Sequence, residues 1–217
     1  MQIVDQSHQT LTRINTDEVY KFLESCGRVA YKSEDKMTQD SAEQFLKSII
    51  ARGHDSVLEH FNISVLFVTD RGVTHELVRH RLCAYTQEST RYCNYSKKGM
   101  TFVKPVFWGL GDKSECYGTW LAAIEECEAN YNRLINKGAS PQEARTVLPN
   151  SLKTEIVCTA NVREWRHILR LRTAKTAYPQ MRALMIPLLK ELTALLPVLF
   201  GDIWEALVGK NESVPQV

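Results

Sequence analysis

The chain has 217 residues, of which 44% are hydrophobic, so it can bury a substantial core, and we expect a single domain over residues 1–217. Its 27 basic and 25 acidic residues leave a formal charge of +2, which excludes the basic excess of a general nucleic-acid binder. Six scattered cysteines form no C-x-x-C pair, so we expect reduced thiols, with neither a metal site nor a disulfide scaffold. The first residues show no basic start followed by an apolar run, and no later apolar run approaches the length that spans a membrane. We therefore expect a soluble, unprocessed protein of the cytoplasm that binds neither membrane nor nucleic acid.

The N-terminal region predicts a weak strand followed by two helices. Residues 1–14 mix β-formers with polar groups and indicate at most an edge strand. Asp17 is expected to cap the first helix, and Gly27 is expected to end it. The second helix begins near Ser41, carries an apolar stripe at helical spacing, and ends at Gly53.

The next stretch contains the best strand signal in the chain. A polar turn over residues 53–60 leads into strict apolar alternation over 61–69. Residues 70–72 predict a turn, after which a short helix is expected to end near Arg79.

The middle of the chain predicts a long helix after an irregular segment. Residues 92–112 are irregular, with a short strand at 101–104, and a helix follows from about 114 to 137. A serine, a proline and an acidic residue at the start of 140–147 favour another short helix. For 152–160, periodicity does not separate a strand from the beginning of a helix.

The C-terminal third predicts two further helices, over 161–172 and about 178–198, the second bending near Pro187, followed by a polar tail from residue 211. No repeat or linker divides the chain. The elements together predict a helix-rich α+β domain with a central, mostly antiparallel or mixed sheet flanked by helices.

A dense group of donors begins at the basic triplet Arg79-His80-Arg81 and continues to Ser89 and Arg91. Positions 79 and 81 would lie 200° apart on a helix, at 100° per residue. Either the helix has ended by residue 79, or the two arginines bind different anions. Arginine offers a planar fork that matches phosphate oxygens. The alternative is a solvated basic turn paired with Glu76 and Glu88.

The segment 87–91 predicts a binding face if it is extended. At a period of two residues, Gln87, Ser89 and Arg91 would then point the same way and contact a phosphate or a base edge.

The segment around His54, Ser56, Glu59 and His60 is compatible with acid/base chemistry. The alternative is a turn capped by a short polar side chain. A zinc helix is excluded for His75 and the histidine of the basic triplet, because they are five residues apart and not four.

Single side chains elsewhere offer weaker hypotheses. Cys83 lies near cations that would lower a thiol pKa, although packing is the alternative. Arginines within apolar helices require a partner when buried, and structural ion pairs are the alternative for them; the three candidates are Arg145, Arg163 and Arg172.

Four ordered motifs resemble those of flavin-dependent thymidylate synthases, and together they span nearly the whole chain. The motifs are Gly53-His54-x-Ser56-x-x-Glu59-His60, Arg79-His80-Arg81-x7-Ser89, Ala144-Arg145-x-x-Leu148-Pro149, and Asn161-x-Arg163 with Leu171-Arg172.

This resemblance implies an enzyme that converts dUMP to dTMP. The one-carbon unit would come from 5,10-methylenetetrahydrofolate, and the hydride would come through FAD from NADPH. It also implies a homotetramer whose active sites combine residues of several subunits. The rival hypotheses are a non-catalytic domain that binds RNA or a phosphoryl ligand, and a cysteine-dependent nucleotide enzyme using Cys83.

The resemblance also implies the site residues. The flavin-binding set is His54, Ser56, Glu59, Arg79, His80, Arg81, Asn161, Arg163, His167 and Leu171. The nucleotide-binding set is Glu76, Arg79, Gln87, Glu88, Ser89, Arg91, Arg145 and Arg172. The catalytic set is Arg172, Ser89 and His54, in which Arg172 polarises the pyrimidine and Ser89 orients the nucleotide without acting as a nucleophile.

Four positions depart from the family pattern. Many members have glutamine at position 76, serine at 30, asparagine at 167 and histidine at 176, where this chain has Glu76, Ala30, His167 and Thr176. Ala30 lacks the side-chain donor that a serine would offer to a flavin.

Overall fold

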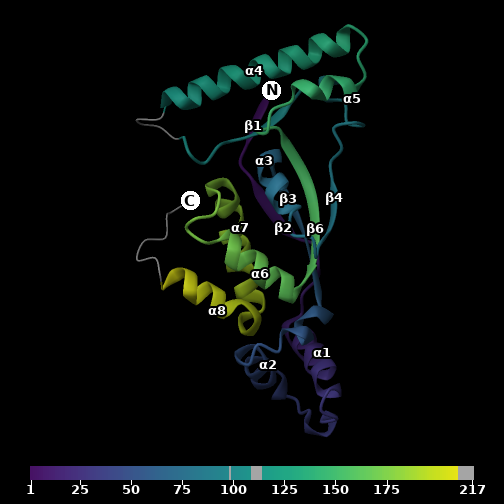
Figure 1. Cartoon of the computed structure of the whole chain (residues 1–217), viewed down its shortest axis with the longest axis vertical. Helices are drawn as coiled ribbons and strands as arrows, with labels where there is room; N and C mark the ends of the chain where they lie inside the picture. The colour runs from purple at the N-terminus through teal and green to yellow at the C-terminus, as the bar shows by residue number, and fades with distance from the viewer. Residues whose placement is uncertain (98, 109–113, 210–217) are drawn as a thin grey trace. The chain divides into compact units, whose positions relative to one another are not determined.

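The computed structural model describes residues 1–97, 99–108 and 114–209, and the chain forms two compact units (Figure 1). Unit 1 comprises Met1–Gln9, Leu66–Arg81 and Tyr85–Cys158, and unit 2 comprises Thr10–Val65, Leu82–Ala84 and Thr159–Val217. Helices and strands are both present in quantity, so the α+β prediction is confirmed. The chain passes between the units four times within strands, and the single domain over 1–217 stays a prediction.

The strands form two sheets where the sequence predicted one. A four-stranded sheet has the order β2-β3-β6-β4, and β1 pairs in parallel with β5 in a separate two-stranded sheet. The strand predictions at 61–69 and 101–104 are confirmed, and the ambiguous stretch at 152–160 is a strand. The bounds are β1 Gln2–Val4, β2 Ser7–Thr10, β3 Asn62–Asp70, β4 Ala84–Gln87, β5 Thr101–Val103 and β6 Lys153–Asn161.

Unit 1 is built around the predicted long helix, α4 (Ser114–Asn136), which lies beside β1 and α5 (Pro141–Ala144) in Figure 1. Ile124 and Tyr131 of α4 pack into an apolar cluster with Phe102 and Leu152. The helical prediction for 140–147 is confirmed as α5 followed by the 3-10 turn η4 (Arg145–Val147), and a further 3-10 turn, η3, spans Tyr95–Lys97.

The turn predicted over residues 70–72 is wrong, because α3 (Arg71–Leu77) begins directly after β3. The carboxylate Oδ1 of Asp70 accepts a hydrogen bond of 2.7 Å from the backbone N–H of Val73 and so caps the helix. Asp70 is only 7% exposed, and this burial raises the pKa of its carboxyl group despite the backbone donors that lower it.

Unit 2 is a cluster of helices. Trp165 is fully buried, and its indole Nε1 donates to the carbonyl of Ile63 at 2.9 Å, which ties α6 (Val162–Arg172) to β3. The 161–172 helix is confirmed. The last predicted helix ends at Leu195, and the sequence analysis missed the helix after it. The bounds are α1 Thr16–Val29, η1 Glu34–Lys36, α2 Ser41–Ala51, η2 Asp55–His60, α6 Val162–Arg172, α7 Pro179–Leu195 and α8 Pro197–Val208.

Pro187 lies inside α7, and the predicted bend there stays a prediction. The predicted polar tail from residue 211 lies outside the described residues.

Among the helices of residues 1–97, 99–108 and 114–209, none combines the length and the apolar character that crossing a membrane requires.

Both predicted ends of the first helix are wrong. Asn15 caps α1 by accepting a hydrogen bond from the N–H of Glu18, so Asp17 lies in the first turn. Gly27 does not end the helix but lies buried within it. A Cβ at this position would stand 2.5 Å from Cζ of Phe45. The glycine is therefore required for close packing of α1 on α2.

Gly27→Ala is expected to lower the free energy of unfolding by about 1–3 kcal/mol, because the added methyl group forces the Phe45 ring out of its place. The matched control is Gly201→Ala in α8, where a Cβ would meet nothing within 4 Å. That substitution should raise stability by about 0.5–1 kcal/mol through helix propensity. Thermal and urea denaturation measure both effects, and equal shifts in the two variants would refute the packing explanation.

Candidate functional site

A cavity of about 1230 Å3 in unit 2 collects several of the residues predicted to bind flavin. Helices α1, α2 and α6 and the 3-10 turn η2 contribute to its wall. His54, Ser56 and Arg163 all line it, although α6 is more than 100 residues away from η2 in the chain. Ala30, where many members of the resembled family have serine, lies on the same wall.

Arg163 and Glu59, both in the predicted flavin set, contact each other. The Arg163 Nη1 donates to the Glu59 Oε1 at 2.5 Å, and the two side chains are 54% and 45% exposed. The hydrogen bond and the charge of Glu59 raise the pKa of Arg163. The pair places the guanidinium at the cavity, where η2 and α6 meet.

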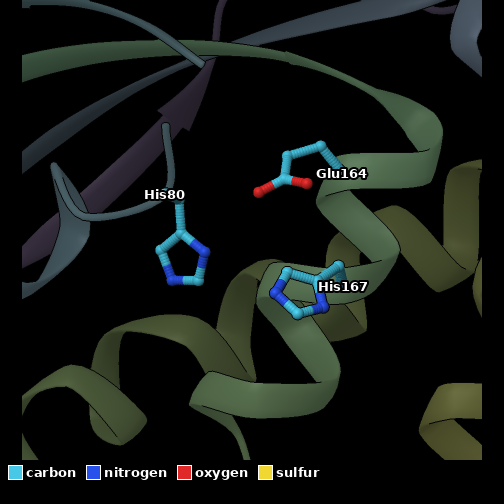
Figure 2. Close-up of side chains that lie close together, drawn as sticks. All are labelled: His80, Glu164 and His167. Carbon is cyan, nitrogen blue, oxygen red and sulfur yellow. The ribbon is translucent and has the colours of Figure 1, made fainter. Parts of the chain in front are cut away.

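Helix α6 and its N-cap position two more of the predicted residues, Asn161 and His167. Asn161 caps the helix, with its Oδ1 accepting from the N–H of Glu164 at 2.9 Å. Figure 2 shows the side chains of Glu164 and His167 extending from the same side of α6, as their spacing of three residues requires. Glu164 is 7% exposed and His167 is exposed. Sequence analysis missed Glu164, whose only signal was its place three residues before a predicted ligand.

The end of α6 carries the predicted catalytic arginine. Arg172, the last residue of the helix, is half-buried, and its neighbour Leu171 is 48% exposed. The deeply buried arginine of this helix is instead Arg166, 3% exposed, which the sequence analysis did not identify. Both guanidinium Nη atoms of Arg166 donate to Asp202 of α8, at 2.8 and 2.7 Å. Arg166 therefore has a structural partner.

The basic triplet 79–81 follows the end of α3 in unit 1. Because α3 ends at Leu77, the first of the two expectations for the triplet, that the helix has ended by Arg79, is confirmed. The hydroxyl of Tyr85 donates to the carbonyls of Leu77 and His80, at 2.6 and 3.0 Å, and fixes the segment. His80, drawn in Figure 2, is 6% exposed, whereas Arg79 and Arg81 are exposed.

The period-two face predicted for 87–91 is not formed, because β4 ends at Gln87 and the chain turns after Ser89. The carbonyl of Ser89 accepts from the N–H of Cys93 at 3.0 Å, and its hydroxyl oxygen accepts from the N–H of Arg91 at 3.3 Å. The Gln87 Nε2 donates to Thr74 and Thr154 hydroxyls. Three predicted ligands therefore lie on one short segment, but not on one strand face.

Glu88 holds this segment in place. Its Oε1 accepts from the Tyr95 hydroxyl at 2.7 Å and its Oε2 accepts from the Lys153 Nζ at 3.3 Å, while its carbonyl accepts from Arg71 Nη2 at 2.9 Å. Burial and the hydrogen bond to Glu88 raise the pKa of Tyr95, so its hydroxyl remains a donor. Glu88 is thus occupied by protein groups, which the sequence did not reveal.

The remaining candidates lie on different elements. Arg145 is the first residue of η4 and is exposed, while Ala144 before it is buried in the core of unit 1. Glu76 is half-buried in α3. Cys83 is half-buried and takes part in no disulfide, and its role as a nucleophile stays a hypothesis.

Comparisons with known proteins identify relatives along most of the chain. The family described as thymidylate synthase complementing protein matches residues 14–198, which include segments of both units. The flavin-dependent thymidylate synthase of Mycobacterium sp. (strain JLS) is 36% identical over 203 residues, covering 83% of this chain and 78% of that protein. The enzyme of the same name from Geobacter sulfurreducens is 33% identical over 170 residues, covering 77% and 72%.

A solved structure shares the fold. The UMP/dUMP methylase PolB from Streptomyces cacaoi, bound with 5-Br dUMP, matches with a TM-score of 0.78 at 20% identity, covering 95% of this chain and 97% of that one. The family match and the relatives agree with the four ordered motifs, and the chain belongs to the thymidylate synthase complementing protein family.

Proposed function

We propose that this protein is a flavin-dependent thymidylate synthase, which methylates dUMP to dTMP. The one-carbon unit comes from 5,10-methylenetetrahydrofolate, and the reducing hydride comes from NADPH through FAD. Support comes from family membership and from relatives of that name over most of the chain. The single observation that carries the proposal is the gathering of His54 and Ser56, from the start of η2, with Arg163 of α6 around one cavity.

The cavity of unit 2 fits a flavin dinucleotide in size and in chemistry. Its volume of about 1230 Å3 exceeds the roughly 300–1,000 Å3 of an ordinary small-molecule site. Phe45 and Val57 supply apolar wall, and Ser56 and Arg163 supply donors for polar groups of a ligand. His54 stands beside them as a further donor or acceptor. These residues would hold FAD, together with the other members of the predicted flavin set.

The nucleotide is proposed to bind through donors that surround its phosphate. Ser89 and Arg91 lie on one turn after β4, and both offer side-chain donors to phosphate oxygens. Arg145 of η4 adds a third donor group. Glu88 is proposed to act through the turn, since its carboxylate is held by Tyr95 and Lys153.

In the proposed reaction, bound FAD supplies the hydride chemistry that amino-acid side chains lack. The chain's own residues bind and orient the nucleotide and polarise its base. Arg172 is proposed to place its guanidinium beside a carbonyl or N3 of the uracil ring, where it stabilises negative charge as the ring is attacked. Ser89 orients the nucleotide by its hydroxyl, and His54 assists from the cavity of unit 2.

The protein is also proposed to form a homotetramer of the cytoplasm with shared active sites. Large apolar side chains next to proposed ligands support association, because Leu82 and Tyr92 are 76% and 78% exposed and directly follow Arg81 and Arg91. The alternative of a non-catalytic RNA- or phosphoryl-binding domain is not favoured, because the relatives that cover most of the chain are named as enzymes.

The visible absorbance spectrum of the purified protein is the first test. Protein carrying oxidised flavin should be yellow, and extraction should release FAD in a ratio of about one per chain. Protein purified without flavin should recover the same spectrum when FAD is added. A colourless preparation that also failed to bind added FAD would refute the proposed function.

A further inference from the structure

One arginine of the cavity in unit 2 is held unusually firmly. Arg28, in the last turn of α1, donates from Nε and Nη2 to the Glu24 Oε1, at 3.0 and 2.7 Å. Glu24 is completely buried, and its second oxygen accepts from the Ser41 hydroxyl at 2.8 Å. The carboxylate is therefore fully used in orienting the guanidinium and in joining α1 to α2.

The Phe45 ring supports the same guanidinium. The Arg28 Cζ lies 4.8 Å from the ring centroid, within the range of a cation–π interaction. The ring packs against Gly27, and it occupies the space that a side chain at position 27 would need. Arg28 is 14% exposed and lines the cavity, so the part of the guanidinium that Glu24 does not use borders this space.

The charges around the cavity favour an anionic ligand. Four arginines and lysines line it, namely Arg28, Lys36, Arg52 and Arg163, against one acidic residue, Asp55. The side chains of Lys36 and Arg52 make no hydrogen bond or ion pair within the described parts of the chain. Their charge is not neutralised by a neighbour, in contrast to that of Arg163, which pairs with Glu59.

We propose that Arg28 binds a phosphate group of the flavin cofactor and that it makes the cavity selective for phosphorylated flavins. This inference rests on the proposed function, and it adds a ligand that the family resemblance did not assign. The remaining N–H groups of Arg28 are the donors. Because Glu24 and Phe45 already fix the guanidinium, little side-chain freedom is lost on binding. Lys36 and Arg52 add long-range attraction for the same anion.

The test compares Glu24→Gln with the double variant Glu24→Gln/Arg28→Gln. The single variant keeps the cation, and the double variant removes it without leaving a buried carboxylate unpaired. Affinity for FAD and for riboflavin, which has no phosphate, is measured by fluorescence quenching. The double variant should bind FAD roughly 10- to 100-fold more weakly than the single variant, because a hydrogen bond to a charged group is lost. Riboflavin affinity should be the same in both.

Two further variants complete the test. Arg28→Lys keeps the charge and a partner for Glu24 but loses the fork, so it should fold and lose FAD affinity by roughly 10-fold. Lys47→Gln, on the exposed side of α2, removes a cation away from the cavity and should leave FAD affinity unchanged. Equal losses for FAD and riboflavin, or none, would overturn the role of Arg28 alone. Wild-type protein that bound no FAD would overturn the proposed function as well.

Discussion

Arg172→Ala is expected to lower kcat for dTMP formation by roughly 100- to 1,000-fold while the purified protein stays yellow. This magnitude is typical when one group that stabilises developing charge is removed. Arg172 ends α6, outside the set of residues that line the cavity of unit 2, so flavin retention should survive the change. Steady-state kinetics and the flavin spectrum of one preparation measure both properties.

Arg170→Ala is the matched control for this prediction. Arg170 lies on the same helix two residues earlier, is 51% exposed, and pairs with Asp202 at 3.0 Å. Its loss removes an equal charge and should change kcat by less than about 3-fold, since exposed pairs contribute little. If Arg172→Ala lost flavin and folding together with activity, the residue would be structural and the assigned role would be wrong.

Asp202→Ala is expected to produce the largest loss of stability. Asp202 is the anionic partner of Arg166, whose side chain is 3% exposed and also donates to the carbonyl of Leu199. Removing the carboxylate leaves a buried guanidinium without its counter-charge. The expected cost is about 3–5 kcal/mol, or a fall in Tm of roughly 10 °C for a chain of this length. Differential scanning calorimetry measures the shift.

The pH dependence gives this prediction a second readout. Burial raises the pKa of Asp202, but the hydrogen bonds and charges of Arg166 and Arg170 outweigh burial and lower it below its ordinary value. A carboxyl group with a lowered folded pKa contributes its stability fully above the unfolded value, about 3.9, and loses it as pH falls through the folded value. Wild type and variant should therefore differ most near neutral pH and converge in acid.

The exposed pair of Lys47 and Glu43 provides the contrast. These side chains are 56% and 60% exposed at 3.3 Å, so Lys47→Ala should cost less than about 0.5 kcal/mol. A similar Tm fall in Lys47→Ala and Asp202→Ala would mean that burial of Arg166 does not govern the effect.

Local patterns predicted most of the secondary structure because those elements carry their own signals. The alternation before Asp70 and the stripe that begins at Ser41 each depend on residues two to four positions apart. The errors arose where a distant contact decided the outcome. Glycine is a residue typical of helix ends, and only the contact with the Phe45 ring explains why Gly27 lies inside α1. The last predicted helix ran to about residue 198, but Pro197 occupies the first turn of a separate helix, α8.

The predicted and the missed residues of the site also differ in whether their signal is local or depends on a distant contact. Motif residues such as His54 and Arg163 were found because their order along the chain resembles a family, and the fold brings them to one cavity. Arg28 and Glu24 belong to no such motif, and their importance depends on Ser41 and Phe45 of the next helix. The sequence alone does not show which residues contact each other, so it gives no reason to select Arg28 and Glu24.

The most direct test of the proposed function is dTMP formation by the purified protein supplied with dUMP, 5,10-methylenetetrahydrofolate, NADPH and FAD. Product should be detected by chromatography, should require every component, and should be accompanied by NADPH oxidation that dUMP stimulates. Protein that is folded and loaded with FAD, yet forms no dTMP under these conditions, would contradict the assignment.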